Sequence, residues 1–178
     1  MRFEQLGWKQ QIQILSTLHK MLNDLYFNGE LEDVKVDIEN LANPNVCGQD
    51  EGYINAGCFF KDKVLYISEN GEMSQRYKIS ISNDFINDAL ANEENCSDDD
   101  QKYYLTRTML HEMIHQYCYQ NGIDEGDHNE TWQQIAWDHG LDASYKDGLP
   151  QREEYLDWYV YDFADGLDFD EMLSGHKG

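Results

Sequence analysis

Apolar residues recur at intervals of three and four along two stretches of the chain, the spacing that places them on one face of an α-helix. The first stretch covers residues 10–27 and is followed by Asn28-Gly29, a pair that ends helices. The second covers residues 99–120 and contains neither Pro nor Gly. Because Ser97 and three aspartates, which are favoured at helix N-termini, come just before or within its first turn, a long helix is predicted here.

Between these helices the pattern changes to the alternation of apolar and polar residues that is typical of β-strands. Strands are predicted over residues 34–38, 52–60, 64–68 and 77–82, with the polar residues 61–63 joining the second strand to the third. The last strand before the long helix, or a neighbour of it, is expected to form an exposed edge of the sheet. A peptide substrate can add to such an edge as an extra strand.

Two helices are predicted after the long one, over residues 129–139 and 152–163. The order of helix, strands and helices indicates an α+β fold in which the helices pack on one face of a small mixed sheet. A break rich in glycine and proline divides the chain into a domain over residues 1–148 and an acidic, aromatic extension over residues 149–178. The end of this extension, from residue 165 onward, is expected to be loosely held.

The composition is strongly acidic, with 35 acidic residues against 13 basic ones among 178 and a net charge of −22. This charge opposes direct binding to nucleic acid and to anionic membrane surfaces, because both depend on Lys and Arg. The four cysteines show no spacing typical of a zinc ribbon or a disulfide framework. Since the chain also begins without an apolar signal segment and contains no stretch of transmembrane length, a cytoplasmic protein is expected.

Candidate chemistry lies in the predicted long helix, where His111, Glu112 and His115 form the pattern H-E-x-x-H. Residues four apart lie on the same side of a helix, so the two imidazoles can bind one Zn²⁺ ion. A catalytic zinc takes three protein ligands and keeps one position for water. The pattern therefore predicts a metallopeptidase that hydrolyses peptide bonds in protein substrates through a zinc-bound water, with Glu112 as the general base.

The third zinc ligand is expected downstream of this motif. A metzincin would carry a histidine at position 121, where this chain has Asn121. His128 is favoured because it follows a polar turn and opens the next predicted helix, which can fold back beneath the first. The other candidate ligands are Asp124, Glu125, Asp127, Glu130 and His139. Acids that can orient a ligand imidazole are Asp124, Asp127 and Asp138, although acids in such loops are more often simply solvated.

The arrangement resembles the SprT-like metalloprotease family, whose eukaryotic relative is Spartan. That family combines H-E-x-x-H with a loop containing glycine and then a histidine followed by an aromatic residue, which here are His128 and Trp132. The similarity covers roughly residues 10–141 and implies a zincin-like fold, a zinc ion and protein substrates. The chain departs from many relatives because it has no zinc ribbon of paired cysteines and no basic surface for DNA.

Three other functions remain open. A catalytically idle zinc-binding domain would share the ligands, but a purely structural site has no need of the carboxylate of Glu112. An acidic protein that imitates nucleic acid fits the charge of −22, but such a mimic requires no metal. A protease for proteins linked to DNA is implied by the Spartan relatives, but the lack of a ribbon and of basic surface opposes it.

Overall fold

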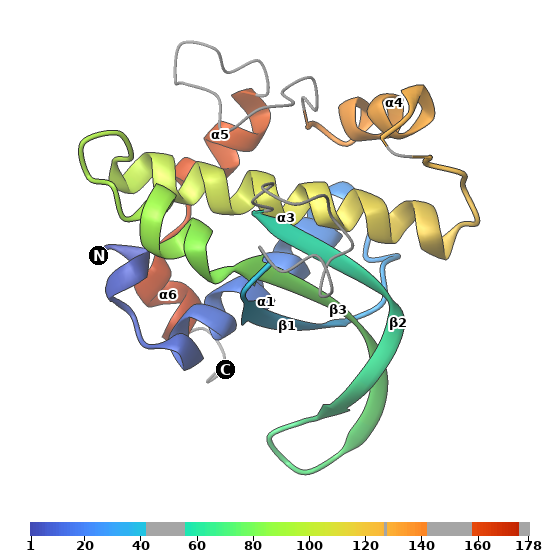
Figure 1. Ribbon diagram of the computed structural model, residues 1–178, viewed down its shortest axis with the longest axis horizontal. Coiled ribbons are helices and arrows are strands. Elements are labelled where there is room, and N and C mark those ends of the chain that lie inside the picture. Colours follow the sequence, from blue (N-terminus) through green and yellow to red (C-terminus); the bar gives the residue numbers. More distant parts are fainter. Residues whose placement is uncertain (42–55, 127, 142–157, 175–178) are drawn as a thin grey trace.

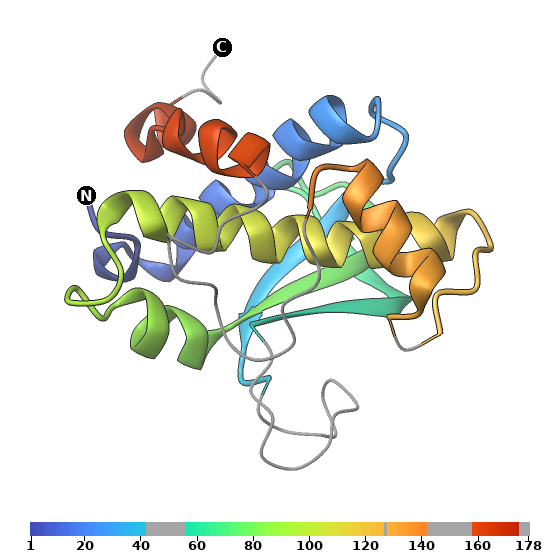
Figure 2. The same cartoon turned by 90° about the horizontal axis from the view of Figure 1, so that it is seen from above.

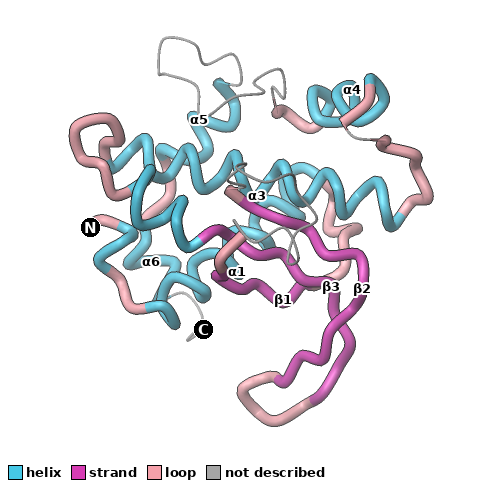
Figure 3. The backbone as a smooth tube through the Cα atoms, viewed as in Figure 1, coloured by secondary structure: helices cyan, strands magenta, loops and turns pink. Residues whose placement is uncertain are grey.

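The computed structural model describes residues 1–41, 56–126, 128–141 and 158–174 (Figure 1). The helices are α1 (Trp8–Tyr26), α3 (Asp98–Gln120), α4 (Glu130–Asp138), α5 (Trp158–Asp165) and α6 (Phe169–Ser174), with two short helical segments, η1 (Phe3–Gln5) and η2 (Phe85–Leu90). The strands are β1 (Val34–Glu39), β2 (Gly57–Ile67) and β3 (Met73–Ser82) (Figure 3). The order of elements confirms the α+β prediction.

The three strands form one mixed sheet in the order β1-β3-β2, with β1 parallel and β2 antiparallel to β3. The strand that precedes α3 is therefore central, and its neighbour β2 lies at an edge of the described sheet. The prediction of separate strands over residues 52–60 and 64–68 was wrong for the described part, because β2 runs unbroken through the polar residues 61–63. The ladder shifts register between Phe60 and Val64, so a bulge accommodates these polar residues within one strand. Residues 52–55 lie outside the described part.

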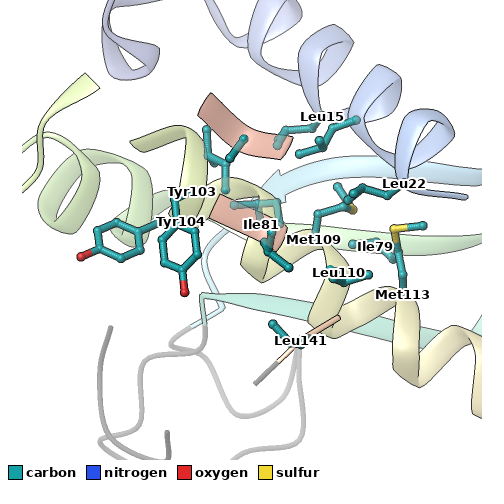
Figure 4. Close-up of a cluster of buried hydrophobic side chains, with 14 of the residues drawn as sticks. Leu15, Leu22, Ile79, Ile81, Tyr103, Tyr104, Met109, Leu110, Met113 and Leu141 are labelled. Atoms are coloured by element: carbon teal, nitrogen blue, oxygen red, sulfur yellow. The ribbon is translucent and has the colours of Figure 1, made fainter. Parts of the chain in front are cut away.

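Helices α1 and α3 cover one face of this sheet, with α1 against β1 and α3 against β2 and β3 (Figure 2). Their apolar faces meet the inward side chains of the central strand, as the close-up in Figure 4 shows for Leu15, Ile79 and Met109. These three side chains are at most 1 % exposed. Because residues at every second position of β3 point inward, this face of the sheet is apolar wherever the helices cover it.

Helix α3 begins with a capping box, which explains why it starts where the sequence predicts. The Ser97 hydroxyl accepts a hydrogen bond from the backbone N–H of Asp100 (3.2 Å), and the Asp100 carboxylate accepts one from the N–H of Ser97 (3.2 Å). At the other end, Gly122 adopts a φ of 66°, in the left-handed region that glycine favours after a helix. Both predicted long helices are thus confirmed within two residues at each end.

The C-terminal helices pack on the domain: α5 lies against α3, and α6 lies against α1. The expectation that the chain is loosely held from residue 165 onward was wrong for Phe169–Ser174, because Phe169 and Met172 are buried. The Phe169 ring packs against that of Phe3, with centroids 5.8 Å apart. Of the helix predicted over residues 152–163, the described part begins at Trp158. None of the helices in the described ranges has the length and apolar character needed to cross a membrane.

Candidate metal centre

Three imidazoles converge where α3 meets the loop that leads to α4. His111 and His115 lie one turn apart on α3, and His128 lies two residues before α4. Their Nε2 atoms form a small triangle: 3.3 Å from His115 to His111, 3.1 Å from His111 to His128 and 3.0 Å from His115 to His128. Nitrogens bound tetrahedrally at 2.0–2.1 Å from one zinc ion are roughly 3.3 Å apart. The triangle is therefore of a size to hold one such ion.

The position of His128 depends on an unusual loop backbone. Gly122 and Gly126 have positive φ angles, and His128 itself has a φ of 60°, a conformation that residues other than glycine adopt rarely. Asn129 then caps α4, because its side-chain oxygen accepts a hydrogen bond from the N–H of Trp132 (3.0 Å). Strained backbone of this kind clusters at functional sites, where the surrounding structure holds it in place.

Glu125 holds the ring of His115. The Nδ1 atom of His115 lies 2.7 Å from a carboxylate oxygen of Glu125, so Nδ1–H donates and Nε2 is left with a lone pair that faces the other two histidines. Such a carboxylate–histidine pair is the arrangement that orients ligands around zinc in other proteins. The sequence identified Glu125 only as an alternative ligand, and its place in the same loop as His128 was the one signal for this role.

The other acids and the remaining histidine lie away from the triangle. Asp124 accepts a hydrogen bond from the N–H of Gly126 (3.0 Å), and Asp138 accepts one from the side chain of Gln134 (2.9 Å). His139 stacks on the ring of Phe27 with centroids 4.7 Å apart. Neither Asp124 nor Asp138 therefore orients an imidazole here. Asp127 lies outside the described residues, and Glu130, at the start of α4, is exposed.

The surroundings move the pKa values of the two α3 histidines in opposite directions. Burial and the neighbouring imidazoles of His115 and His128 hold the pKa of His111 well below its usual range, so this ring is neutral. Burial also lowers the pKa of His115, but the hydrogen bond to Glu125 and the charges of Glu112 and Glu125 outweigh it and raise the pKa. A neutral imidazole is the form that binds a metal ion.

Glu112 follows His111 on α3, and its side chain lies against the start of β2. Its side chain is 6 % exposed, and its carboxylate accepts a hydrogen bond from the backbone N–H of Phe59. Burial is the main cause that raises the pKa of this carboxyl to about 7, and the charge of Glu125 adds to it. A carboxyl with a pKa near neutrality is suited to accept and release a proton during catalysis.

Glycine at position 57 lets the strand approach this carboxylate. A Cβ atom there would lie 3.0 Å from Cγ of Glu112 and 3.1 Å from Cγ2 of Thr108. Both distances are tighter than ordinary side-chain contacts, so a larger residue would require the side chains of Glu112 and Thr108, or the strand, to move. Local sequence patterns give no sign of this contact, because it joins residues 55 positions apart in the chain.

The indole ring of Trp132 in α4 packs against the rings of all three histidines. Its ring lies 4.8 Å from that of His111, 5.0 Å from His115 and 4.5 Å from His128, measured between centroids. The side chain is 1 % exposed, and its indole Nε1 has no hydrogen-bond partner in the described structure. The indole therefore restricts how all three rings can turn.

Of the cysteines in the described part of the chain, two are free and one is disulfide-bonded. Cys96 and Cys118 are free and buried, and burial raises the pKa of Cys118 to about 11, so its thiol stays protonated. Cys118 thus packs as a small apolar group. Cys58, next to Gly57, is disulfide-bonded, and its partner lies outside the described residues. The sequence spacing showed no sign of this bond.

Three histidines that could hold a metal ion, next to a buried carboxylate, fit the site of a metallopeptidase, and the comparison with protein families agrees with this class. The model of the family described as metallopeptidase toxin 3 matches residues 7–141, which is more than half of the chain. The chain therefore belongs to the metallopeptidase toxin 3 family, and a peptidase family implies protein substrates. No curated protein and no solved structure gave a match. The predicted SprT-like relationship is supported only at the coarser level of a metallopeptidase.

Proposed function

We propose that this protein is a zinc-dependent endopeptidase in which His111, His115 and His128 bind the zinc ion through Nε2. The observation that carries the proposal is the triangle of the three Nε2 atoms, 3.0–3.3 Å on each side, with Glu112 next to His111 on the same turn of α3. The oriented ring of His115 and the neutral ring of His111 support it. A purely structural zinc site has four protein ligands, whereas three leave a position open for catalysis.

The residues of this chain divide the chemistry between them. A bound zinc ion supplies a Lewis acid that acidifies water and stabilises negative charge on a carbonyl oxygen. Glu112 accepts the proton of the attacking water and delivers it to the nitrogen of the leaving amine. The buried setting of Glu112 and the Phe59 N–H hold its carboxylate in one place between these two transfers.

We further propose that the substrate lies along the edge of β2. This strand pairs with β3 on one side, and its inner end touches Glu112 at Gly57 and Phe59. An extended peptide that pairs with β2 through main-chain hydrogen bonds would pass the carboxylate with little demand on its side chains. A helix bearing both histidines beside such an edge strand is a zincin-like arrangement, and it is what supports a closer relationship to SprT-like proteases.

The domain boundary belongs to the same proposal. Residues 1–148 would form the catalytic domain, since the matched family region ends at residue 141. Residues 149–178 would form an extension that docks on it, since α5 packs on α3 and α6 on α1.

The test is the substitution Glu112→Gln, which keeps the size of the side chain and removes its ability to accept a proton. Zinc content should stay near one ion per chain, while cleavage of an unfolded protein substrate should fall by about 10³-fold or more. The control is Asp138→Asn, on the exposed side of α4, which also replaces a carboxylate by an amide and should keep activity. A zinc-loaded wild-type protein that cleaves nothing would support the catalytically idle domain instead. Full activity of Glu112→Gln would remove Glu112 from the reaction.

A further inference from the structure

The hairpin formed by β2 and β3 carries exposed apolar side chains that are not part of the buried core. The hairpin extends well beyond the helices, as Figures 1 and 3 show. Near its tip, Leu65, Ile67 and Met73 are 52 %, 59 % and 71 % exposed. We call these three residues the hairpin face. Exposed apolar side chains that gather on one surface mark sites of interaction more often than isolated ones do.

The hairpin face continues the side of the sheet that the helices cover. Ile67 pairs with Met73 and Leu65 with Gln75, so these side chains point to the same side. Along β3, every second residue from Met73 onward leads to Ile79 and Ile81, which are fully buried beneath the helices. The sheet therefore presents one largely apolar side, and its outer part extends beyond the helices (Figures 1 and 3).

The same strand connects the hairpin face to the proposed active site. The inner end of β2 touches Glu112, and its outer end carries Leu65 and Ile67. Eleven residues of extended chain span roughly 30 Å, the length of about ten substrate residues. Between the two ends, Tyr119 from the last turn of α3 packs against Tyr77 of β3, with centroids 5.8 Å apart. An extended polypeptide that follows β2 would reach both places at once.

Positive charge lies along this path in an otherwise acidic molecule. The strands β2 and β3 hold four of the 13 basic residues, Lys61, Lys63, Arg76 and Lys78, against one acidic residue, Asp62. Lys63 pairs with Glu32, and Lys78 with Glu39. Lys61, at the bulge, lies over the Tyr119 ring at 5.8 Å and has no carboxylate partner within the described residues. Its ammonium group is therefore available to an acidic ligand.

We propose that the β2–β3 hairpin is a docking site for the substrate, and that it selects unfolded polypeptide segments with alternating apolar residues and an acidic residue nearer the cleaved bond. The apolar residues lie on the hairpin face, and the acidic residue pairs with Lys61. The proposal rests on the endopeptidase function proposed above. It assigns the choice of substrate to a surface about 30 Å long rather than to the metal centre alone.

The experiment compares fluorogenic peptides that share one cleavable core. Each carries an eight-residue extension at one end or the other: acidic–apolar, basic–apolar, or glycine–serine. The zinc-loaded wild type should cleave the acidic–apolar peptide with a kcat/KM about tenfold higher than the glycine–serine peptide, mainly through KM. The triple variant Leu65→Ser, Ile67→Ser, Met73→Ser should lose this preference, and Lys61→Glu should shift it toward the basic–apolar peptide.

The matched control is Trp8→Ser with Leu25→Ser, which removes exposed apolar side chains from α1 and should keep the preference. Binding of the same peptides to zinc-loaded Glu112→Gln, measured by fluorescence anisotropy, separates docking from cleavage. Binding that depends on the hairpin face without any cleavage by the wild type would contradict the proposed function and support the docking site. Equal kcat/KM for all extensions, or an unchanged preference in the triple variant, would overturn the docking site alone. A monomer–dimer shift in sedimentation of the triple variant would assign the face to contact between two copies and would also overturn it.

Discussion

His115 and Gln116 are neighbours on α3, yet they belong to two polar clusters on different sides of the helix. Gln116 accepts a hydrogen bond from Nε2 of His19 (3.0 Å) and donates to the carbonyl oxygen of Glu32 (2.8 Å). In that cluster each donor meets an acceptor. Around His115, three ring nitrogens instead face one another at 3.0–3.3 Å, and the carboxylate of Glu125 binds the far side of the ring. Nitrogens that converge in this way leave room for a cation rather than for each other's protons.

The comparison shows that α3 carries a structural polar cluster on one side and the proposed metal-binding cluster on another. The His19 cluster fastens α1 to α3 and is closed: His19 is 2 % exposed and Gln116 is fully buried. The His115 cluster is only partly buried and lies between α3 and the loop before α4. A histidine on a helix can therefore be structural or a candidate metal ligand. Nε2 of His19 has the amide oxygen of Gln116 as its hydrogen-bond acceptor, whereas Nε2 of His115 faces two other ring nitrogens.

The largest effects should come from breaking each cluster in turn. His115→Ala should weaken zinc binding by more than about 100-fold, because a ligand is lost rather than merely reoriented. Gln116→Ala should keep zinc but lower the free energy of unfolding by about 1–3 kcal/mol, since it leaves buried groups of His19 and Glu32 unpaired. Zinc titration and urea unfolding of both variants check this. If the two substitutions weakened zinc equally, the proposed separation of the clusters would be wrong.

A subtler change removes only the carboxylate that holds His115. Glu125→Gln should lower the affinity for zinc by about 10- to 100-fold, because the ring loses the anion that fixes its orientation. Asp124→Asn is the matched control, one residue away in the same loop, and should bind zinc like the wild type. Competition with a chelator of known affinity measures both. An unaltered affinity in Glu125→Gln would mean that the loop alone orients the ring.

The smallest predicted effect is on how the free energy of unfolding depends on pH, through His19 of the closed cluster. Burial is the main cause that lowers the pKa of His19, against the opposing hydrogen bond to Gln116. The stability that its neutral form contributes is therefore present above the unfolded value near 6.5 and is lost as the pH falls toward the lower folded value. His19→Gln, which keeps a donor for Gln116, should make stability flatter between pH 7.5 and 5.5, by at most about 1.4 kcal/mol per pH unit.

Urea unfolding of metal-free wild type and variant at several pH values gives this difference directly. Metal-free protein is used because protonation of the other histidines would otherwise release zinc at low pH and change the stability of both proteins. Parallel curves for the two proteins would show that His19 becomes protonated equally easily in the folded and unfolded states, and its burial would then have no influence on acid stability.

Local patterns account for what the sequence predicted well. The helix over residues 99–120 was correct because its cap, its apolar spacing and its stop are all encoded within the segment. The closeness of His111 and His115 follows from helix geometry alone. His128 was favoured because it opens the next helix, and the structure brings its ring to the other two.

The features that sequence reasoning missed all depend on contacts between distant segments. The bulge in β2 depends on its pairing with β3, and the burial of Phe169 depends on a ring near the N-terminus. Gly57 became significant only once β2 was seen against Glu112. Glu125 and Asp124 are adjacent and chemically alike, so only the fold of the loop distinguishes the one that binds His115.

The most direct test of the metal centre is X-ray diffraction from zinc-loaded crystals, with data collected on both sides of the zinc absorption edge. The account predicts a single strong anomalous peak at the centre of the triangle, with Nε2 of His111, His115 and His128 about 2.0–2.1 Å away. A peak coordinated by other residues, or rings of these histidines that point apart in metal-loaded protein, would contradict it.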